Sequence, residues 1–343
     1  MIIDNFDLNK KVMIIAELSA NHGQKLDVAI QTIKAAKRAG ADAIKLQTYT
    51  ADTITINSNK PDFQIKGTIW DGKNLYQLYK EAYTPWEWHE KLFRVAKEEG
   101  LICLSSPFDK TAVDLLQSLN TPAYKIASFE ITDIPLIEYV ASKGQPVIIS
   151  TGIAGLEDIE LAIDACKRMD NEQIVLLKCT SSYPAPVEEA NLAMIPDLAQ
   201  RFGVIAGLSD HTMGITVPIA ATIMGAKVIE KHFILDRSIG GPDASFSSDE
   251  KEFTALVKAV REAEAAIGRV DYTLSDKMQK SREFSRSLYV VENMKAGEVI
   301  SEQNVRSIRP GYGLHPKFYR EVLGKKVKID LERGEPLDFS KIN

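Results

Sequence analysis

The sequence predicts an α/β protein built as a closed (β/α)₈ barrel, the TIM-barrel fold, followed by a small β-rich C-terminal domain. Eight short apolar runs rich in Val, Ile and Leu alternate strictly with amphipathic stretches over residues 12–268. The chain then changes to short strand patterns with KAGE and ERGE turns. A doubly wound open sheet is the alternative. It usually carries a Gly-rich phosphate loop after its first strand, and ELSANHGQ is not such a loop.

Each apolar run is short enough to be a strand buried on both faces. The strands are expected at residues 12–17, 41–48, 100–106, 122–128, 145–151, 173–180, 202–210 and 226–233. Helical periodicity lies between and after them, at residues 27–40, 85–100, 110–119, 156–169 and 252–268. Two of the first four stretches end in glycine, Gly40 and Gly100, which is typical of a helix C-terminus.

Composition shifts divide the chain into three parts. We expect the barrel domain at residues 1–268, a polar linker at 269–283 and the small β-rich domain at 284–343. One insertion, residues 50–84, interrupts the barrel rhythm after the second strand and is rich in aromatic residues. Its position at the active-site face of a barrel favours a lid or a substrate wall, and a packed surface loop is the alternative.

Composition also limits the class of function. The chain has 343 residues and a net charge of −5, which gives no general attraction to nucleic acid or to anionic membranes. It contains no apolar run long enough to span a membrane and no signal-peptide pattern at its start. Its three widely spaced cysteines suggest neither a disulfide framework nor a zinc knuckle, so we expect a cytoplasmic protein.

Polar residues gather where the predicted strands end. In a TIM barrel the catalytic groups lie at the C-terminal ends of the strands, whereas branched apolar side chains fill the interior. A single strand-end serine is more often a helix cap or a turn former, but here nearly every strand has polar residues in register. The candidates are Glu17, Lys45, Gln47, Ser106, Lys125, Ser128, Glu130, Ser150, Ser181, Tyr183, Ser209, His211 and His232.

Two of the five histidines, His211 and His232, lie at the ends of the seventh and eighth strands, which are neighbours in a closed barrel. Glu17 ends the first strand, the other neighbour of the eighth. Two imidazoles, a carboxylate and open positions suit Mn²⁺, Fe²⁺, Co²⁺ or Zn²⁺. Two hydrogen-bonded core histidines are the alternative.

Lys45 and Lys125 are costly inside a barrel unless an anion compensates their charge. A phosphate or carboxylate ligand would do so, and the serine-rich loops would add hydroxyl and N–H donors. A structural Lys125–Glu130 pair and a Schiff-base lysine are the alternatives. Donors on several sides favour anion binding.

The motifs resemble the sialic-acid synthase family, in order and over residues 10–340. In the barrel they are IIAELSANHG, AIKLQT, LSSPFD, YKIASFE, IISTG, CTSSYPAP, GLSDHT and EKHFILDRSIGGPDASFS. The tail, RSLYVVENMKAGEVISEQNVRSIRPGYGLHP, is similar to the family's antifreeze-like (SAF) domain. The resemblance implies an enzyme that joins phosphoenolpyruvate to the aldehyde carbon of an N-acetylated amino sugar and releases phosphate.

Within the family, GTIWDGKNLYQLYKEAYTPWEWH and GGPDASFS are closest to the branch that uses 2,4-diacetamido-2,4,6-trideoxy-L-altrose. The N-acetylneuraminate synthases carry a histidine after Gly-Pro-Asp, and here Ala244 stands instead. An N-acetylneuraminate or legionaminate synthase is the alternative within the family. A metal-dependent pyruvate aldolase and a non-catalytic carbohydrate-binding protein are the rivals outside it.

The resemblance also implies roles for individual residues. His211 and His232 would hold a divalent metal, Mn²⁺, Mg²⁺ or Co²⁺, and Glu17, Glu130 and Lys125 would be catalytic. The expected substrate-binding residues are Lys45, Gln47, Ser106, Ser128, Ser150, Ser181, Tyr183, Ser209, Asp243 and Arg309. Two departures are Ser181, where the family has Asn, and Ser106, where it has Thr.

Arg309 matches an arginine that reaches the sugar in the partner subunit, which implies a domain-swapped homodimer. A deoxy sugar presents a methyl group where sialic acid precursors present a hydroxyl. We therefore expect Phe246 and the aromatic residues at 63–83 to form an apolar wall for it.

Overall fold

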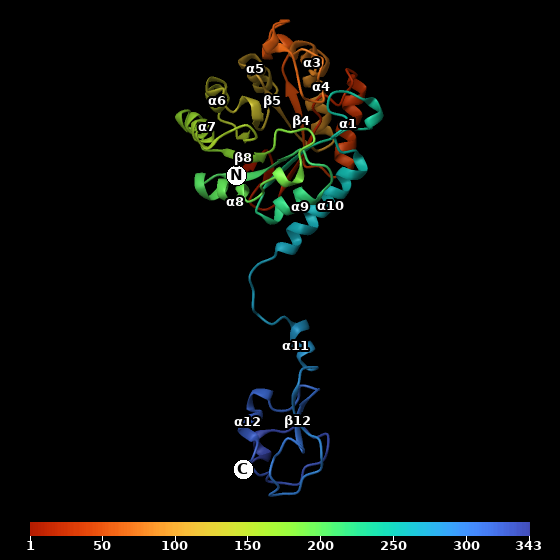
Figure 1. The fold of residues 1–343 in the computed structure, drawn as a ribbon, viewed down its shortest axis with the longest axis vertical. Coiled ribbons are helices and arrows are strands. Elements are labelled where there is room, and N and C mark those ends of the chain that lie inside the picture. The colour runs from red at the N-terminus through yellow and green to blue at the C-terminus, as the bar shows by residue number, and fades with distance from the viewer. The chain divides into compact units, whose positions relative to one another are not determined.

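A computed structural model describes residues 1–343, which form two compact units, Met1–Gly268 and Arg269–Asn343. The first unit confirms the predicted barrel. Its eight strands are parallel and close in the order β10-β3-β4-β5-β6-β7-β8-β9. Figure 1 shows the strands of this unit inside a ring of helices. The strands are β3 (Met13–Glu17), β4 (Ala43–Thr48), β5 (Ile102–Pro107), β6 (Tyr124–Ile126), β7 (Val147–Ser150), β8 (Ile174–Cys179), β9 (Ile205–Asp210) and β10 (Val228–His232).

Helices surround these strands and cover them with their apolar faces. They are α1 (Leu26–Arg38), α2 (Ala51–Ile54), α3 (Leu75–Ala82), α4 (His89–Glu98), α5 (Lys110–Ser118), α6 (Ile134–Ala141), α7 (Leu156–Arg168), α8 (Met194–Phe202), α9 (Thr216–Ile223) and α10 (Glu250–Ile267). Gly40 and Gly100 follow α1 and α4 with φ of +88° and +69°, as expected of helix-ending glycines. None of the helices has both the length and the apolar character that crossing a bilayer requires.

The barrel interior changes from apolar to polar along the strands. Its lower part is a fully apolar cluster, to which β3 contributes Met13 and Ile15, and β5 contributes Ile102 and Leu104. Because side chains alternate across a strand, the next inward residue on β3 is Glu17. On each of the seven remaining strands, the residue that follows the apolar inward positions is also polar or ionisable. These residues are Lys45, Ser106, Lys125, Ser150, Cys179, Ser209 and Glu230.

A short N-terminal hairpin closes the apolar end. Strands β1 (Ile2–Ile3) and β2 (Phe6–Asp7) pair antiparallel, and Ile3 and Leu8 are completely buried against the interior cluster. The sequence patterns did not predict this hairpin, because two-residue strands leave no periodicity. With one end filled by apolar side chains, ligands can reach the polar layer only at the C-terminal ends of the strands.

The insertion at 50–84 contains two helices that the sequence analysis missed. Asn74 caps α3 in a reciprocal arrangement, in which the Asn74 side chain accepts from the Gln77 N–H and the Gln77 side chain accepts from the Asn74 N–H. Thr50 and Thr53 cap α2 in the same way. The Asn-x-x-Gln pattern was the available signal for α3, although a helix of eight residues gives only a short periodic run.

The second unit has its own apolar core, which includes Leu288, Met294, Val305 and Leu337. It contains α11 (Asp276–Arg282), the antiparallel pair β11 (Ser287–Val290) and β12 (Val305–Ile308), and α12 (Tyr319–Val322). Isolated bridges such as Met294–Leu331 complete a small β-rich fold of the predicted kind. The short helix α11 lies within the segment interpreted as a linker.

Candidate active site

Four charged side chains meet in the polar layer of the barrel. The Lys45 Nζ lies 2.8 Å from Glu17 Oε2 and donates to Glu230 Oε1 at 2.9 Å. The Lys125 Nζ lies 3.8 Å from the same Glu230 oxygen. All four side chains are at most 6% exposed. The layer therefore places two ammonium groups around one carboxylate in a nearly dry environment.

The electrostatics of this layer follow from burial and mutual charge. Burial, together with the nearby Lys125, lowers the pKa of Lys45 to about 8, although Glu230 favours its charged form. Burial opposes ionisation of Glu230, but Lys125 and Lys45 outweigh it and lower its pKa. Glu17 and Glu230 each keep at least one buried carboxylate oxygen without a hydrogen-bond partner. A layer with such open polar atoms is prepared to receive further polar groups.

The predicted serines surround the lysines. Ser150 Oγ accepts from Lys125 Nζ at 2.7 Å, and Ser209 Oγ donates to Glu230 Oε1 at 3.2 Å. Ser128 and Ser181 lie 2.8 Å apart, hydroxyl to hydroxyl. Ser106 Oγ is buried and makes no hydrogen bond within the protein. The structure thus brings together the serines of five strand ends.

His211 and His232 lie side by side, with ring centroids 5.4 Å apart. His211 Nδ1 is 2.9 Å from the Thr180 carbonyl, to which it donates, so Nε2 keeps its lone pair in the neutral ring. His232 Nδ1 is buried without a hydrogen bond, and the nearest carboxylate oxygen, Asp243 Oδ2, is 3.8 Å away. Two imidazoles with unused nitrogens fit the chemistry of a divalent metal site.

Protonation of the two histidines differs. Burial, His211 and Lys45 hold the pKa of His232 well below its usual range, which keeps this imidazole neutral. Burial also opposes protonation of His211, but Cys179, the Thr180 carbonyl and Asp210 raise its pKa. A cation would compete with that proton. No group of three or more His, Cys, Asp or Glu side chains forms a complete metal site, so other ligands would have to come from water or substrate.

A pocket of about 190 Å³ opens above the charged layer. The predicted residues Gln47, Ser128, Glu130, Tyr183, His232 and Asp243 line it. Burial raises the pKa of Glu130 to about 7, with Lys125 opposing and Asp133 adding to the shift. Asp243 Oδ2 accepts from Ser19 Oγ at 2.5 Å. The pocket therefore holds a carboxyl group whose pKa is near neutrality, as a proton-transfer group requires.

Two of the predicted substrate-binding residues, Phe246 and Arg309, do not line this pocket. Phe246 is 3% exposed and packs against His232 and Tyr183, with centroids 5.0 and 5.2 Å away, and it is not among the pocket-lining residues. It backs the two rings instead of facing the pocket. Arg309 directly follows β12 in the second unit.

Glu230 is the main site residue that the sequence analysis did not select. It is the first residue of the EKHF run. The available signal was the two-residue spacing to His232, which places both side chains on the inward face of β10. Its neighbour Lys231 points to the other face, where it is paired with Asp210 at 2.5 Å.

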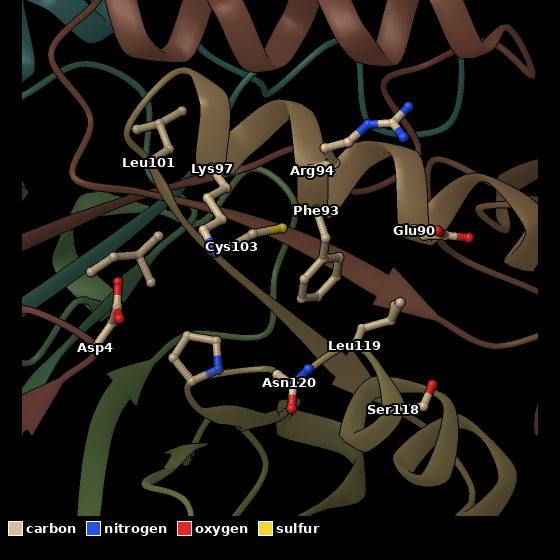
Figure 2. A pocket seen from close by; sticks show the side chains of 12 residues that line it. Asp4, Glu90, Phe93, Arg94, Lys97, Leu101, Cys103, Ser118, Leu119 and Asn120 are labelled. Atoms are coloured by element: carbon tan, nitrogen blue, oxygen red, sulfur yellow. The ribbon is translucent and has the colours of Figure 1, made fainter.

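A larger cavity, of about 650 Å³, lies elsewhere. Figure 2 shows Phe93, Lys97, Cys103 and Leu119 among the side chains around it. It opens beside the start of β5, at the end of the barrel that the N-terminal hairpin closes. Its positively charged groups, Arg94 and Lys97, are exposed and none of the predicted site residues reaches it. The predicted site residues instead line the smaller pocket at the opposite strand ends.

Known families and relatives match nearly the whole chain. The model of the NeuB family matches residues 32–272, and that of the SAF domain matches residues 285–343. Pseudaminic acid synthase of Campylobacter jejuni subsp. jejuni serotype O:23/36 (strain 81-176) is 51% identical over 340 residues, covering 99% of both chains. Pseudaminic acid synthase of Helicobacter pylori (strain ATCC 700392 / 26695) is 48% identical, covering 96% of this chain and 97% of its own.

Among solved structures, the fold is similar to that of N-acetylneuraminic acid synthetase from Leptospira borgpetersenii serovar Hardjo-bovis, crystallised with citrate. The TM-score is 0.73 at 31% sequence identity, and the match covers 82% of this chain and 94% of that one.

Proposed function

The chain belongs to the NeuB family, and from this we propose that it condenses phosphoenolpyruvate with 2,4-diacetamido-2,4,6-trideoxy-L-altrose to give pseudaminic acid and phosphate. The observation that carries the proposal is the stack of two chemically distinct layers in one barrel mouth. The lower layer contains a buried pair of lysines with serine hydroxyls. The upper layer is a pocket that contains a histidine and Glu130, a carboxyl group with a pKa of about 7.

The lower layer suits phosphoenolpyruvate, which carries up to three negative charges. Lys45 and Lys125 supply charge-assisted donors, and Ser106 has a hydroxyl with no partner within the protein. In the free protein Glu17 and Glu230 neutralise these lysines in part. An arriving anion would share the ammonium donors with the two glutamates, which hold the lysine side chains in place before the substrate binds.

His211 and His232 would hold the divalent cation, which we expect to be Mn²⁺, Mg²⁺ or Co²⁺. When bound, such an ion supplies a Lewis acid beside the pocket. The chain's own part is to keep both imidazoles oriented. The Thr180 carbonyl fixes His211 through Nδ1, and Phe246 and Tyr183 pack against His232.

The reaction forms one C–C bond and breaks one C–O bond. C3 of phosphoenolpyruvate attacks the aldehyde carbon of the open-chain sugar, water adds at C2, and phosphate leaves from the tetrahedral intermediate as the C2 carbonyl forms. Glu130, with a pKa of about 7, would donate the proton that the aldehyde oxygen takes up. Glu17, which lies against Lys45 in the lower layer, would accept a proton from the water that adds at C2.

The second unit would complete the site. Arg309 directly follows β12, and we propose that it contacts the sugar in the active site of the partner subunit of a homodimer.

A phosphate-release assay tests the function. The protein would receive phosphoenolpyruvate, Mn²⁺ and one of three sugars: N-acetylmannosamine, the diacetamido altrose, or the diacetamido mannose epimer derived from bacillosamine. We expect phosphate release with the diacetamido altrose at a kcat/KM well above that with the others. Release only with one of the other sugars would overturn the choice of substrate. A product formed from pyruvate without phosphate would indicate an aldolase, and sugar binding without turnover would indicate a carbohydrate-binding protein.

A further inference from the structure

The lining of the pocket contains two kinds of side chain. Glu130, Asp243 and His232 are titratable, and we call them the polar side. A second group contains no charged side chain, and we call it the apolar lobe: Tyr49, Ile54, Leu78, Tyr79, Ala82 and Phe108. The proposed function assigns the polar side and leaves the apolar lobe without a role.

The apolar lobe is a packed wall built mainly by the insertion at 50–84. Leu78 and Ala82 lie one turn apart on α3 and are 7% and 8% exposed. Tyr49 is 3% exposed, and its ring meets those of Tyr79 and Phe108 edge-on at 5.6 and 5.0 Å. Ile54, the last residue of α2, adds a branched aliphatic side chain to this wall. The tight aromatic packing indicates a preformed surface.

The apolar lobe continues the inward face of β4. Lys45, Gln47 and Tyr49 succeed one another at the two-residue spacing of one strand face. Lys45 lies in the charged layer, Gln47 lines the pocket, and Tyr49 belongs to the apolar lobe. The histidines come from β9 and β10, and β10 is separated from β4 by β3. A sugar with its aldehyde carbon over the charged layer, beside the histidines, would direct its far end toward the apolar lobe.

We propose that the apolar lobe is a specificity subsite for the C6 methyl group of a 6-deoxy amino sugar. This inference rests on the proposed function, because it concerns the second substrate of the same site. A buried methyl group gains from leaving water, whereas a hydroxyl in its place would lose hydrogen bonds to water that the alkyl groups and ring carbons of this wall cannot replace. An apolar pocket discriminates against an added hydroxyl by about 10- to 100-fold.

The experiment compares two sugars that differ only at C6: the diacetamido trideoxy-altrose and its 6-hydroxy counterpart. The ratio of their kcat/KM values is measured for the full-length wild type and for Ile54→Thr, which makes the wall polar with little change in shape. Ala82→Ser is a second, smaller change in the same wall. Ile56→Thr is the matched control, because Ile56 is 62% exposed and does not line the pocket.

We expect the wild type and Ile56→Thr to prefer the deoxy sugar by about 10- to 100-fold. Ile54→Thr and Ala82→Ser should reduce that ratio several-fold, with the KM for phosphoenolpyruvate unchanged. A wild-type ratio near one, or a ratio that neither variant changes, would overturn the inference. Failure of the proposed function is a separate outcome, because it would appear as no phosphate release by the wild type with the deoxy sugar.

A binding measurement supplies a readout that does not depend on turnover. The sugar reduced to its alditol cannot react, and saturation-transfer NMR reports which of its protons lie close to the protein. We expect the strongest transfer at the C6 methyl group, beside the rings of Tyr49 and Phe108. Stronger transfer at both acetamido methyl groups than at C6 would overturn the assignment.

Discussion

At the scale of single residues, we propose that binding of the first substrate depends on the layer of buried charges. Lys45 contacts both Glu17 and Glu230, and all three are almost completely buried. Removing a buried partner leaves the remaining charges uncompensated, which costs about 3 kcal/mol. Under the proposed function, lysine at this position would therefore serve both stability and ligand binding.

We predict that Lys45→Met raises the KM for phosphoenolpyruvate by about 100-fold, because one charge-assisted hydrogen bond to a charged ligand is worth up to about 3 kcal/mol. Steady-state kinetics with varied phosphoenolpyruvate would measure the change. Lys258→Met is the matched control, because Lys258 is 77% exposed on α10. An unchanged KM in Lys45→Met would show that the anion binds elsewhere.

Glu130 should make stability depend on pH. Burial raises its pKa in the folded protein to about 7, above the ordinary value of 4.5. A raised carboxyl pKa stabilises the fold fully below pH 4.5, and this contribution is lost as pH rises through about 7. The loss amounts to at most about 3 kcal/mol. Urea unfolding gives the free energy of unfolding at pH 5 and at pH 8. The difference between these two values should be smaller for Glu130→Gln than for wild type, and equal differences would contradict the assignment.

The sequence predicted most of this layer because its residues follow strand alternation. Glu17, Lys45 and Lys125 each stand on the inward face after apolar neighbours. Glu230 obeys the same rule, but it is followed directly by Lys231 and His232, so the run of three polar residues has no alternation that singles out its inward member. Phe246 could not be placed from sequence, because only the fold shows that its ring backs His232 and Tyr183.

At the scale of elements, β9 and β10 hold the two histidines, and an ion pair links the two strands on their outer face. Lys231 Nζ lies 2.5 Å from Asp210 Oδ2, and both side chains are at most 3% exposed. The other Asp210 oxygen accepts from the Thr212 N–H and hydroxyl. His211 lies between Asp210 and Thr212, so this pair fixes the backbone that carries the imidazole.

We predict that Asp210→Asn lowers the free energy of unfolding by about 3 kcal/mol, because it leaves Lys231 buried without a counter-ion. The double variant with Lys231→Met should recover part of that loss. Chemical denaturation of the single and double variants measures both values. Additive losses in the double variant would mean that the two side chains act independently.

The cap of α3 offers a prediction about the insertion. Asn74→Ala removes the N-cap bond, which is worth about 1 kcal/mol, and loosens the helix that carries Leu78 and Ala82. The KM for the sugar should rise, while that for phosphoenolpyruvate stays unchanged. Asp249→Ala removes the equivalent cap of α10 and serves as the control. An equal effect of both variants on the sugar KM would contradict the role of α3.

The barrel strands were predictable because each is a continuous apolar run. Helices α1, α4, α5, α7 and α10 were predictable because each has a clear period. The expected strand at 122–128 is shorter in the structure, Tyr124–Ile126, because Ser128–Glu130 turn into a 3₁₀ helix. The hairpin formed by β1 and β2 left no signal, since its strands have only two residues each. Helices α2 and α3 were missed because four and eight residues give too little periodicity.

At the scale of the whole molecule, the chain combines two units with separate cores. The barrel core and the core around Leu288 and Val305 share no residue. Arg309 belongs to the second unit, whereas the lysines and histidines belong to the first. The proposed action of Arg309 in a partner subunit therefore makes a prediction about mixtures of variants.

Lys45→Met and Arg309→Ala should each lose most activity, but in a homodimer they damage different halves of a shared site. We predict that mixing and re-equilibrating the two inactive variants restores up to about a quarter of wild-type activity, because random pairing makes half of the dimers mixed, each with one intact site. Phosphate release measures the recovery. No recovery in a mixture shown to exchange subunits would contradict the shared site.

The most direct test of the central claim follows the bridging oxygen of phosphoenolpyruvate. Substrate labelled with ¹⁸O between C2 and phosphorus is supplied with the diacetamido altrose and Mn²⁺, and the released phosphate is analysed by mass spectrometry. Condensation by C–O cleavage in the pocket between the lysine layer and the histidines predicts that the phosphate carries the ¹⁸O and that the sugar product gains three carbons. Unlabelled phosphate, or labelled substrate left intact beside a condensed product, would contradict the account.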